Sequence, residues 1–259
     1  MNLTILVDKM IKRIVFRIIS KLRETKWKYK FSRSNVRIVG KCNIEKNVEI
    51  HNSIIFVDST SELVIMEGVK IDGVGIYLTN GAKMTIGKYS ILHRERNFYK
   101  PEYIVDAGIV SIADHVLLKM QRLWVRFGGV LTMNQYTQIN FGSEVRCDNK
   151  VEIGSHCMIS YNVRIWDTNT HCKMLPEKKH ELDVRKYPNL GLEIERPKTL
   201  PVIIGNDCWL GEYSTILKGT VLKDNVNVGF RTLVSNMVIP KDYSVVQDLS
   251  VKMFQTSHN

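Results

Sequence analysis

The sequence predicts an all-β protein of the solenoid class, in which short strands wind in repeated coils around a narrow core. Apolar residues recur at every sixth position, a period that fits neither a helix nor the simple alternation of a strand. The chain has 259 residues, 44% of them hydrophobic, which is enough for one large domain of this kind. No composition shift or flexible linker indicates an independent second domain.

The first 35 residues form a basic segment that lacks the sixfold spacing. Residues 1–37 hold eleven Lys or Arg against Asp8 and Glu24, so most of the net charge of +11 lies here. Because the excess sits at one end, we expect no nucleic-acid-binding face along the molecule. Residues 3–23 read as an amphipathic helix with a basic side and an apolar side. The apolar side holds Val7, Met10, Ile11, Ile14, Val15, Ile18, Ile19 and Leu22.

This helix is interrupted by charge too often to span a bilayer, and it lacks the small-residue cleavage site of a signal peptide. Lysines alternate with Trp27 and Tyr29 in "KWKYKF", a composition that suits an anionic membrane surface. A helix packed against its own domain or a neighbouring subunit explains the same pattern. The sequence leaves both interpretations open for residues 1–30.

The chain contains five cysteines, with neither an even count nor metal-ligand spacing. This usage favours a reducing compartment without disulfides. We therefore expect a cytoplasmic protein, either free or held peripherally at the inner face of the cell membrane. Cys172 next to His171 suggests a thiol nucleophile, but neighbours on an extended chain point to opposite faces, so a packing role is favoured.

Residues 36–254 are predicted to form the solenoid domain. Each hexapeptide is interpreted as one side of a triangular coil, with its first residue pointing into the core. The clearest sixfold series is Ile204, Leu210, Ile216, Leu222, Val228 and Val234. The same spacing relates Phe141, Cys147, Ile153, Ile159 and Ile165, and more weakly Ile38, Ile44, Ile50, Ile65 and Ile71. Residues 92–105 interrupt the pattern.

A longer break, residues 172–200, is charged and has no sixfold spacing, which predicts a loop that projects from the coil. The stretch "IWDTNTHCK" places Asp167, Asn169 and His171 immediately before this loop. Polar side chains at the point where a repeat ends can face a groove instead of the core. We expect the loop to fold over a neighbouring subunit and to shape a substrate site.

The segment "PVIIGNDCWLGEYSTILKGTVLKDNVNVGFRTLVSNMVIPKDYSVVQDLSVKMF" resembles the C-terminal part of hexapeptide-repeat acyltransferases. The resemblance implies a left-handed parallel β-helix, acetyl-CoA as donor, and a homotrimer with active sites between subunits. "DTNTH" together with "CWLG" is most similar to the O-acetyltransferases of bacterial surface polysaccharides. The specific part of the resemblance extends from about Asn140 to Phe254.

The resemblance identifies His171 with the catalytic histidine of the family. A sugar hydroxyl is a poor nucleophile, and a neutral imidazole can take its proton during attack on a thioester. Asp167 or Asn169 is expected to fix the orientation of the ring, and the sequence does not distinguish between them.

Five further residues match acceptor and oxyanion positions of the family. Trp209 corresponds to a tryptophan that lines the acceptor and thioester site. The peptide between Gly211 and Glu212 corresponds to a backbone N–H donor for the developing oxyanion. Asn140 and Asp148 match positions that contact acceptor hydroxyls, although both also suit a structural corner.

The cofactor-binding positions implied by the resemblance depart from the family pattern. Gly229, Phe230 and Arg231 stand where small residues commonly run beside pantetheine. Ser235 and Asn236 replace a common Thr and Lys, which removes one phosphate-binding cation. Lys252 matches a basic residue near the CoA phosphates.

The sequence therefore predicts an O-acetyltransferase that moves an acetyl group from acetyl-CoA to a sugar of a surface polysaccharide or its lipid-linked precursor. A homotrimer and a carbohydrate or glycolipid acceptor are expected. The chain shows no zinc pattern or nucleic-acid module, so neither a metal nor a nucleic-acid partner is expected. Two alternatives stay open: an acetyltransferase for a small acceptor such as serine or an amino sugar, and a non-catalytic trimeric scaffold.

Overall fold

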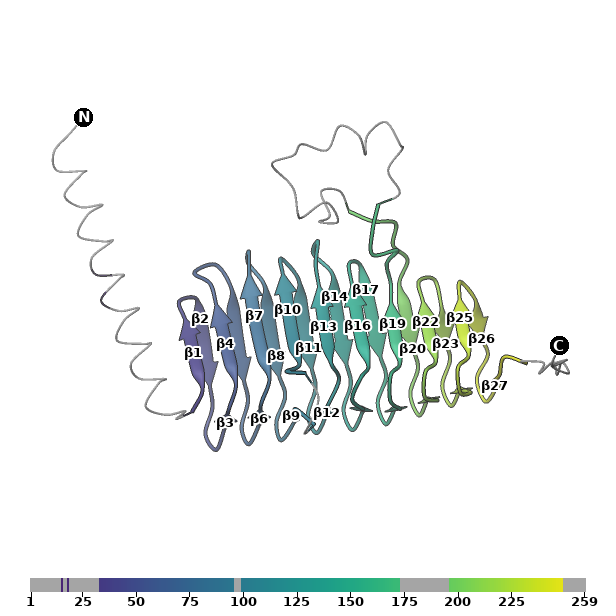
Figure 1. The fold of residues 1–259 in the computed structure, drawn as a ribbon, viewed down its shortest axis with the longest axis horizontal. Helices are drawn as coiled ribbons and strands as arrows, with labels where there is room; N and C mark the ends of the chain where they lie inside the picture. The colour runs from purple at the N-terminus through teal and green to yellow at the C-terminus, as the bar shows by residue number, and fades with distance from the viewer. Residues whose placement is uncertain (1–14, 16–17, 19–32, 96–98, 173–195, 249–259) are drawn as a thin grey trace, which may run out of the picture.

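The computed structural model describes residues 15, 18, 33–95, 99–172 and 196–248, and it shows a long parallel β-helix (Figure 1). The strands form three nine-stranded sheets, here called A, B and C, and each coil contributes one strand to each sheet. Every pairing between strands of neighbouring coils is parallel, as in Ile165 with Val145 and with Ile216. The predicted fold class, an all-β parallel helix of hexapeptide repeats, is confirmed.

The strands have the following bounds. Sheet A contains β1 (Asn35–Ile38), β4 (Ile54–Val57), β7 (Gly75–Thr79), β10 (Glu102–Asp106), β13 (Arg122–Val125), β16 (Glu144–Cys147), β19 (Arg164–Trp166), β22 (Thr215–Leu217) and β25 (Leu233–Ser235). Sheet B contains β2 (Lys41–Ile44), β5 (Glu62–Ile65), β8 (Lys83–Ile86), β11 (Ile109–Ile112), β14 (Val130–Met133), β17 (Lys150–Ile153), β20 (Val202–Ile204), β23 (Val221–Leu222) and β26 (Val238–Ile239). Sheet C contains β3 (Glu49–His51), β6 (Lys70–Asp72), β9 (Ile91–His93), β12 (Leu117–Leu118), β15 (Gln138–Ile139), β18 (Met158–Ile159), β21 (Trp209–Leu210), β24 (Asn227–Val228) and β27 (Ser244–Val245).

The three sheets meet at three edges of a triangular prism. Edge AB is the row of corners where each coil passes from sheet A to sheet B, and edge BC is the next row. Edge CA is the row of corners where the chain leaves the sheet C strand of one coil and enters the sheet A strand of the next coil. Because the strands are in register, equivalent residues of successive coils lie in rows about 4.8 Å apart. Each edge therefore presents a straight row of corner side chains.

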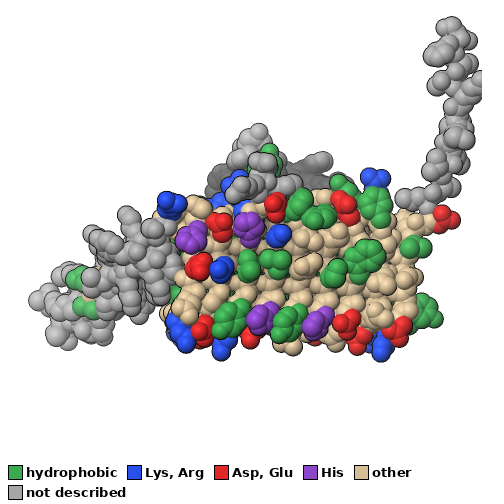
Figure 2. Space-filling model, turned by 90° about the horizontal axis from the view of Figure 1, so that it is seen from below, with side chains coloured by type: hydrophobic (Ala, Val, Ile, Leu, Met, Phe, Trp, Pro, Cys, Tyr) green, Lys and Arg blue, Asp and Glu red, His purple; other side chains and the backbone are tan. Residues whose placement is uncertain are grey.

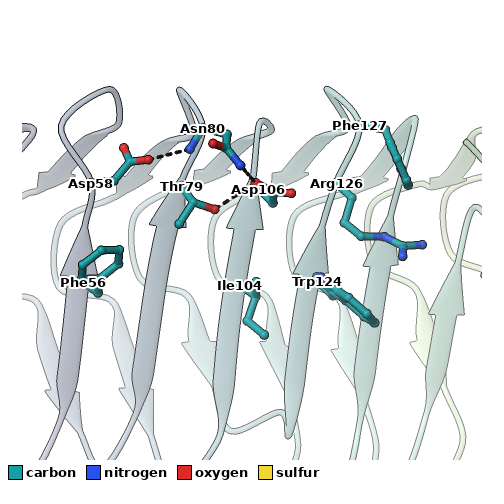
Figure 3. A pocket seen from close by; sticks show the side chains of 9 residues that line it. All are labelled: Phe56, Asp58, Thr79, Asn80, Ile104, Asp106, Trp124, Arg126 and Phe127. Atoms are coloured by element: carbon teal, nitrogen blue, oxygen red, sulfur yellow. Dashed lines mark hydrogen bonds between the residues drawn. The ribbon is translucent and has the colours of Figure 1, made fainter. Parts of the chain in front are cut away.

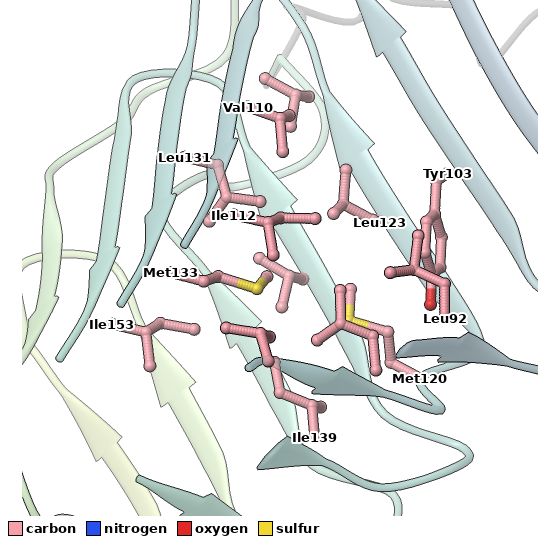
Figure 4. Close-up of a cluster of buried hydrophobic side chains, with 14 of the residues drawn as sticks. Leu92, Tyr103, Val110, Ile112, Met120, Leu123, Leu131, Met133, Ile139 and Ile153 are labelled. Carbon is pink, nitrogen blue, oxygen red and sulfur yellow. The ribbon is translucent and has the colours of Figure 1, made fainter. Parts of the chain in front are cut away.

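The core is a narrow column of side chains contributed by all three sheets (Figure 4). The main sixfold series predicted from the sequence, from Ile204 to Val234, is buried throughout. The prediction for Phe141 is wrong, because β15 ends at Ile139 and the corner that follows turns Phe141 outward. Ile139 is buried in its place, and the Phe141 ring contacts the Tyr161 ring at 4.5 Å between centroids. Ile44 is only partly buried, against the first coils.

The two sequence interruptions lie at corners and leave the stack of coils continuous. Residues 94–101 connect β9 to β10 at edge CA, and β10 still pairs with both β7 and β13. The longer insertion leaves edge AB after β19 and returns before β20, and its residues 173–195 lie outside the described part. Of the predicted N-terminal helix only Val15 and Ile18 are described, both helical and about half exposed.

Candidate active site

Asp167 fixes the corner from which the insertion departs. Its side chain is completely buried on edge AB. Oδ1 accepts a hydrogen bond from the backbone N–H of Asp148 at 2.8 Å, and Oδ2 accepts one from Asn149 at 2.7 Å. Burial raises the pKa of this carboxyl, although the two backbone hydrogen bonds act in the opposite direction. Asp167 therefore ties its own coil to the preceding one.

The two ends of the insertion are held together beside this corner. Thr168 and Thr199 form an antiparallel bridge, and the backbone N–H of Asn169 donates to the carbonyl of Lys198 at 3.1 Å. Thr170 has a left-handed backbone, with φ of 65°, and its N–H donates to Thr168 Oγ1 at 3.0 Å. The chain then presents His171 on the surface, with its N–H bonded to the Asn169 carbonyl at 2.8 Å. The imidazole thus projects from a short paired stem.

A buried ion pair supports the stem from the neighbouring coils. Arg126 binds Asp148 through two hydrogen bonds, Nε to Oδ1 at 2.9 Å and Nη2 to Oδ2 at 2.7 Å. Nη2 of Arg126 also approaches the carbonyl oxygen of Thr170 at 3.4 Å. At the returning end of the insertion, Arg196 Nη2 donates to the backbone carbonyl of Asp148 at 2.6 Å. Asp148, matched in sequence to an acceptor contact, is 1% exposed and engaged by both arginines.

Sequence reasoning missed Arg126 and Arg196. Arg126 immediately follows β13 as Asp148 follows β16, so the two occupy equivalent corners of successive coils. Counting one coil backward in the sequence from Asp148 would have identified Arg126 as its neighbour. Arg196 carries no periodic signal because it lies inside the insertion.

Edge CA carries most of the other predicted residues. Asn140 lies in the coil before that of Ser160, and its Nδ2 donates a hydrogen bond to the backbone carbonyl of Ile159 at 3.3 Å. A Cβ on Gly211 would lie 2.8 Å from the carbonyl oxygen of Val228, so close stacking of the coils requires glycine there. The N–H of Gly211 is bonded to this same oxygen at 2.7 Å.

The Glu212 backbone N–H lies at the corner that follows Gly211. Among the described residues it has no hydrogen-bond acceptor, whereas the Glu212 carbonyl accepts from Arg231 at 3.0 Å. The role of this peptide as an oxyanion donor stays a prediction.

Aromatic and basic side chains surround this corner. Trp209 is 50% exposed on the outer face of sheet C, and Figure 2 shows hydrophobic side chains gathered along this face. Arg231 lies over the rings of Phe230 and Tyr213, at 5.0 and 5.6 Å from their centroids. A Cβ on Gly229 would lie 2.8 Å from Cγ1 of the exposed Val246 side chain, so a larger residue there requires that side chain to shift.

The predicted site residues thus fall into two groups on different parts of the prism. Edge AB holds Asp148, Asp167, Asn169, His171 and Asn236, with Ser235 at the adjoining end of β25. Edge CA holds Asn140, Gly211, Glu212, Gly229, Phe230 and Arg231, and sheet C holds Trp209. Edge AB lies opposite sheet C in a triangular coil, so one chain does not bring His171 and Trp209 together. Lys252 lies outside the described residues, and the role of every residue here stays a prediction.

Two further findings concern metal binding and membrane crossing by the described residues. Within residues 33–95, 99–172 and 196–248, no group of three or more His, Cys, Asp or Glu side chains is arranged to hold a metal ion. No helix among the described residues is both long enough and apolar enough to cross a membrane.

Comparison with known proteins gives one relative by sequence. The chain is 28% identical over 139 residues to WbbJ of Escherichia coli (strain K12), named provisionally as a lipopolysaccharide biosynthesis O-acetyl transferase. The match covers 53% of this chain and 68% of WbbJ. No protein-family model matches the chain. The resemblance to surface-polysaccharide O-acetyltransferases inferred from the sequence is confirmed by this relative.

Two solved structures show a weaker likeness. The polysialic acid O-acetyltransferase OatWY is 20% identical with a TM-score of 0.40, over 86% of this chain and 94% of that one. The polySia-specific acetyltransferase NeuO is 16% identical with a TM-score of 0.38, over 83% of each chain. At these scores we draw no inference from either structure.

Proposed function

We propose that the protein is an O-acetyltransferase that moves an acetyl group from acetyl-CoA to a hydroxyl of a sugar in a surface polysaccharide or its lipid-linked precursor. The observation that carries this proposal is the exposed His171 on a stem held by Asp167 and by the Arg126–Asp148 pair. The similarity to WbbJ supports the reaction class and the kind of acceptor.

The reaction proposed is direct transfer. His171 takes the proton of the acceptor hydroxyl while the hydroxyl oxygen attacks the thioester carbonyl carbon. The N–H of Glu212 stabilises the oxyanion that forms on the carbonyl oxygen. When the oxyanion collapses, the carbon–sulfur bond breaks, and the protonated imidazole returns its proton to the CoA thiolate. Neither an acyl-enzyme nor a metal takes part in this sequence.

We place the active site between two copies of the chain in a homotrimer. Edge AB of one copy would supply His171, and edge CA with sheet C of its neighbour would supply Trp209 and the Glu212 N–H. Phe230 is 57% exposed beside Arg231, and together they offer an aromatic face and a cation to the nucleotide end of acetyl-CoA. The separation of the two groups within one chain is the reason for this arrangement.

We also propose a cytoplasmic location, with residues 1–30 in contact with the inner face of the membrane. Lipid-linked sugar precursors are found at such a surface, and the basic amphipathic pattern of this segment suits anionic lipids. The test is sedimentation with anionic liposomes before and after removal of residues 1–30. Equal sedimentation of the two proteins would contradict the membrane contact.

The enzymatic proposal is tested by release of CoA thiol from acetyl-CoA, with and without an extracted pool of polysaccharide or lipid-linked acceptor. We expect acceptor-dependent release by the wild type and a loss of roughly a hundredfold or more in His171→Ala. His51→Ala is the matched control, because His51 is exposed on β3, six coils before Trp209 in sheet C and in the first coil of the solenoid.

Three results would redirect the assignment. Equal rates for wild type and His171→Ala would remove His171 as the base. Release with serine or a free amino sugar but not with the polymer pool would favour the small-acceptor enzyme. No release and no acetyl-CoA binding would favour the trimeric scaffold.

A further inference from the structure

Edge AB carries a hollow in its N-terminal half, several coils before His171. It has a volume of about 650 Å³ and is open to solvent. Phe56 and Trp124 stand at its two ends, and Ile104 lies between them on the outer face of sheet A (Figure 3). Since β4 and β13 are three strands apart, the two aromatic side chains are separated by about 14 Å along the coil axis.

The hollow exists because one aromatic side chain of this row lies away from it. Tyr77 is in register with Phe56 and Ile104, but it is not part of the lining. Its ring rests on Gly75 of the same strand, where a Cβ would lie 2.9 Å from Tyr77 Cε2. Gly75 is the first residue of β7, whereas the hollow lies near edge AB, beyond the last residue of that strand. The Tyr77 ring therefore leans away from the hollow.

Polar side chains of edge AB line the upper side of the hollow. Oδ1 of Asp106 accepts hydrogen bonds from Thr79 Oγ1 at 2.9 Å and from Asn80 Nδ2 at 2.6 Å. Its other oxygen accepts none from the described residues and points along the hollow toward Arg126 (Figure 3). Asp58 Oδ2 accepts from the backbone N–H of Asn80 at 2.8 Å. Asp58 Oδ1 accepts three further hydrogen bonds, from Thr60 and Ser61, so Asp106 is the carboxylate with an oxygen left for a ligand among the described residues, and Asp58 adds negative charge.

The exposed parts of these groups suit a neutral carbohydrate, although the guanidinium groups of Arg126 and Arg146 lie over the Trp124 ring, at 4.5 and 5.4 Å from its centroid. Pyranose rings place C–H groups against aromatic faces and present hydroxyl donors at their rims, where carboxylates accept them. Arg126 is paired with Asp148 through two hydrogen bonds, so its charge is already compensated. Asp58 and Asp106 then leave the hollow negative, which disfavours phosphates and acidic sugars.

One residue that lines the hollow, Arg126, also contacts the candidate catalytic corner. Arg126 lines its end and also approaches the carbonyl of Thr170, the residue before His171, at 3.4 Å. The coil of His171, that of β19, is two coils beyond β13, or about 10 Å along the axis. A sugar chain lying along edge AB would extend from the hollow to the imidazole.

We infer that this hollow is a subsite for an uncharged stretch of the acceptor polysaccharide, bound a few sugars away from the hydroxyl that is acetylated. The inference rests on the proposed function for the identity of the acceptor, whereas binding to the hollow itself requires no acetyl transfer.

The test is calorimetric titration of the full-length protein, without acetyl-CoA, with chito- and malto-oligosaccharides of two and six sugars. Oligogalacturonate of six sugars is the anionic comparison. We expect at least one neutral hexamer to bind more tightly than its dimer and more tightly than the anionic hexamer. Trp124→Ala and Asp106→Asn should each weaken that binding about tenfold.

Two controls keep the result specific. Tyr136→Ala removes an aromatic side chain that is 51% exposed on edge BC, and it should leave the dissociation constant unchanged. Trp124→Phe keeps an aromatic face and should recover most of the affinity lost in Trp124→Ala. Light scattering checks that each variant keeps the oligomeric mass of the wild type.

The inference is overturned if no neutral oligosaccharide binds, if Trp124→Ala and Asp106→Asn bind as the wild type does, or if the anionic chain binds best. A Trp124→Ala protein with altered oligomeric mass and unchanged affinity would identify the face as a contact between copies and would also overturn it. Neutral-chain binding without any acetyl transfer would instead refute the proposed function and leave the subsite standing.

Discussion

Edges AB and CA are built from the same coils, yet their corner side chains are held in different ways. At edge AB, Asp148 and Asp167 are buried and bonded, and a paired stem carries His171. At edge CA, Phe230 and Arg231 are exposed and contact mainly one another and Tyr213. A group that must take a proton at a defined point needs fixed orientation, whereas side chains that bind a long donor can remain on the surface.

The largest effect is expected from an experiment that separates the two edges genetically. Co-expression of His171→Ala with Trp209→Ala chains should give mixed trimers in which some interfaces pair an intact His171 with an intact Trp209. If each site takes one residue from each of two copies, about a quarter of sites are complete in a random mixture. The recovered rate should then be about a quarter of the wild-type rate, measured as thiol release.

The two single variants, purified separately, provide the baseline for this experiment. Each should be strongly impaired, and mixing them after purification should restore nothing unless subunits exchange. Co-expressed trimers no more active than the singles would show that His171 and Trp209 act within one chain or that Trp209 has no role. Either outcome would contradict the proposal that edge AB of one copy and edge CA of another form one active site.

The next largest effect concerns the buried pair of edge AB. Arg126→Ala leaves Asp148 buried without its ion-pair partner, which should lower the free energy of unfolding by about 3–5 kcal/mol. Urea denaturation measures this loss. Arg231→Ala is the matched control, because this exposed arginine should change stability by less than about 0.5 kcal/mol. Equal stability of the two variants would mean that the Arg126–Asp148 contact does not hold edge AB.

Replacing Asp167 should lower the free energy of unfolding by a smaller amount, and this effect should depend on pH. Asp167→Ala leaves one buried and one partly buried backbone N–H group without acceptors, which should lower the free energy of unfolding by about 2–4 kcal/mol. Burial raises the pKa of the folded carboxyl above its ordinary value of 3.8, so the native state binds the proton more readily than the unfolded state. Asp167 therefore stabilises the fold most below pH 3.8, and this contribution declines as pH rises through the folded pKa.

The pH dependence is read by comparing wild type with Asp167→Asn, which cannot ionise. The free energy of unfolding of the wild type, minus that of Asp167→Asn, should decrease as pH rises from about 3 toward neutrality. A difference that moves in the opposite direction would show that the hydrogen bonds from Asp148 and Asn149 outweigh burial at this carboxyl.

The sixfold spacing was sufficient to predict the fold, because each coil buries one apolar residue per side and stacking repeats that pattern. It did not predict Phe141, since a corner of different length shifts the inward position to Ile139. It also did not show that His171 and Trp209 lie on different sides of the coil, which depends on the number of corners between them. Arg126 was missed because its partner is a whole coil away in sequence.

The smallest predicted effect concerns donor binding at edge CA. Arg231 is exposed, so its attraction to a phosphate is weakened by water and salt. Arg231→Ala should raise KM for acetyl-CoA about three- to tenfold, with kcat little changed, and the ratio to wild type should shrink as salt increases. Lys70→Ala on sheet C, far along the coils, is the matched loss of one surface cation and should leave KM unchanged. An unchanged KM for Arg231→Ala would place the CoA phosphates elsewhere, whereas a fall in kcat alone would mean that this edge contacts the reacting group.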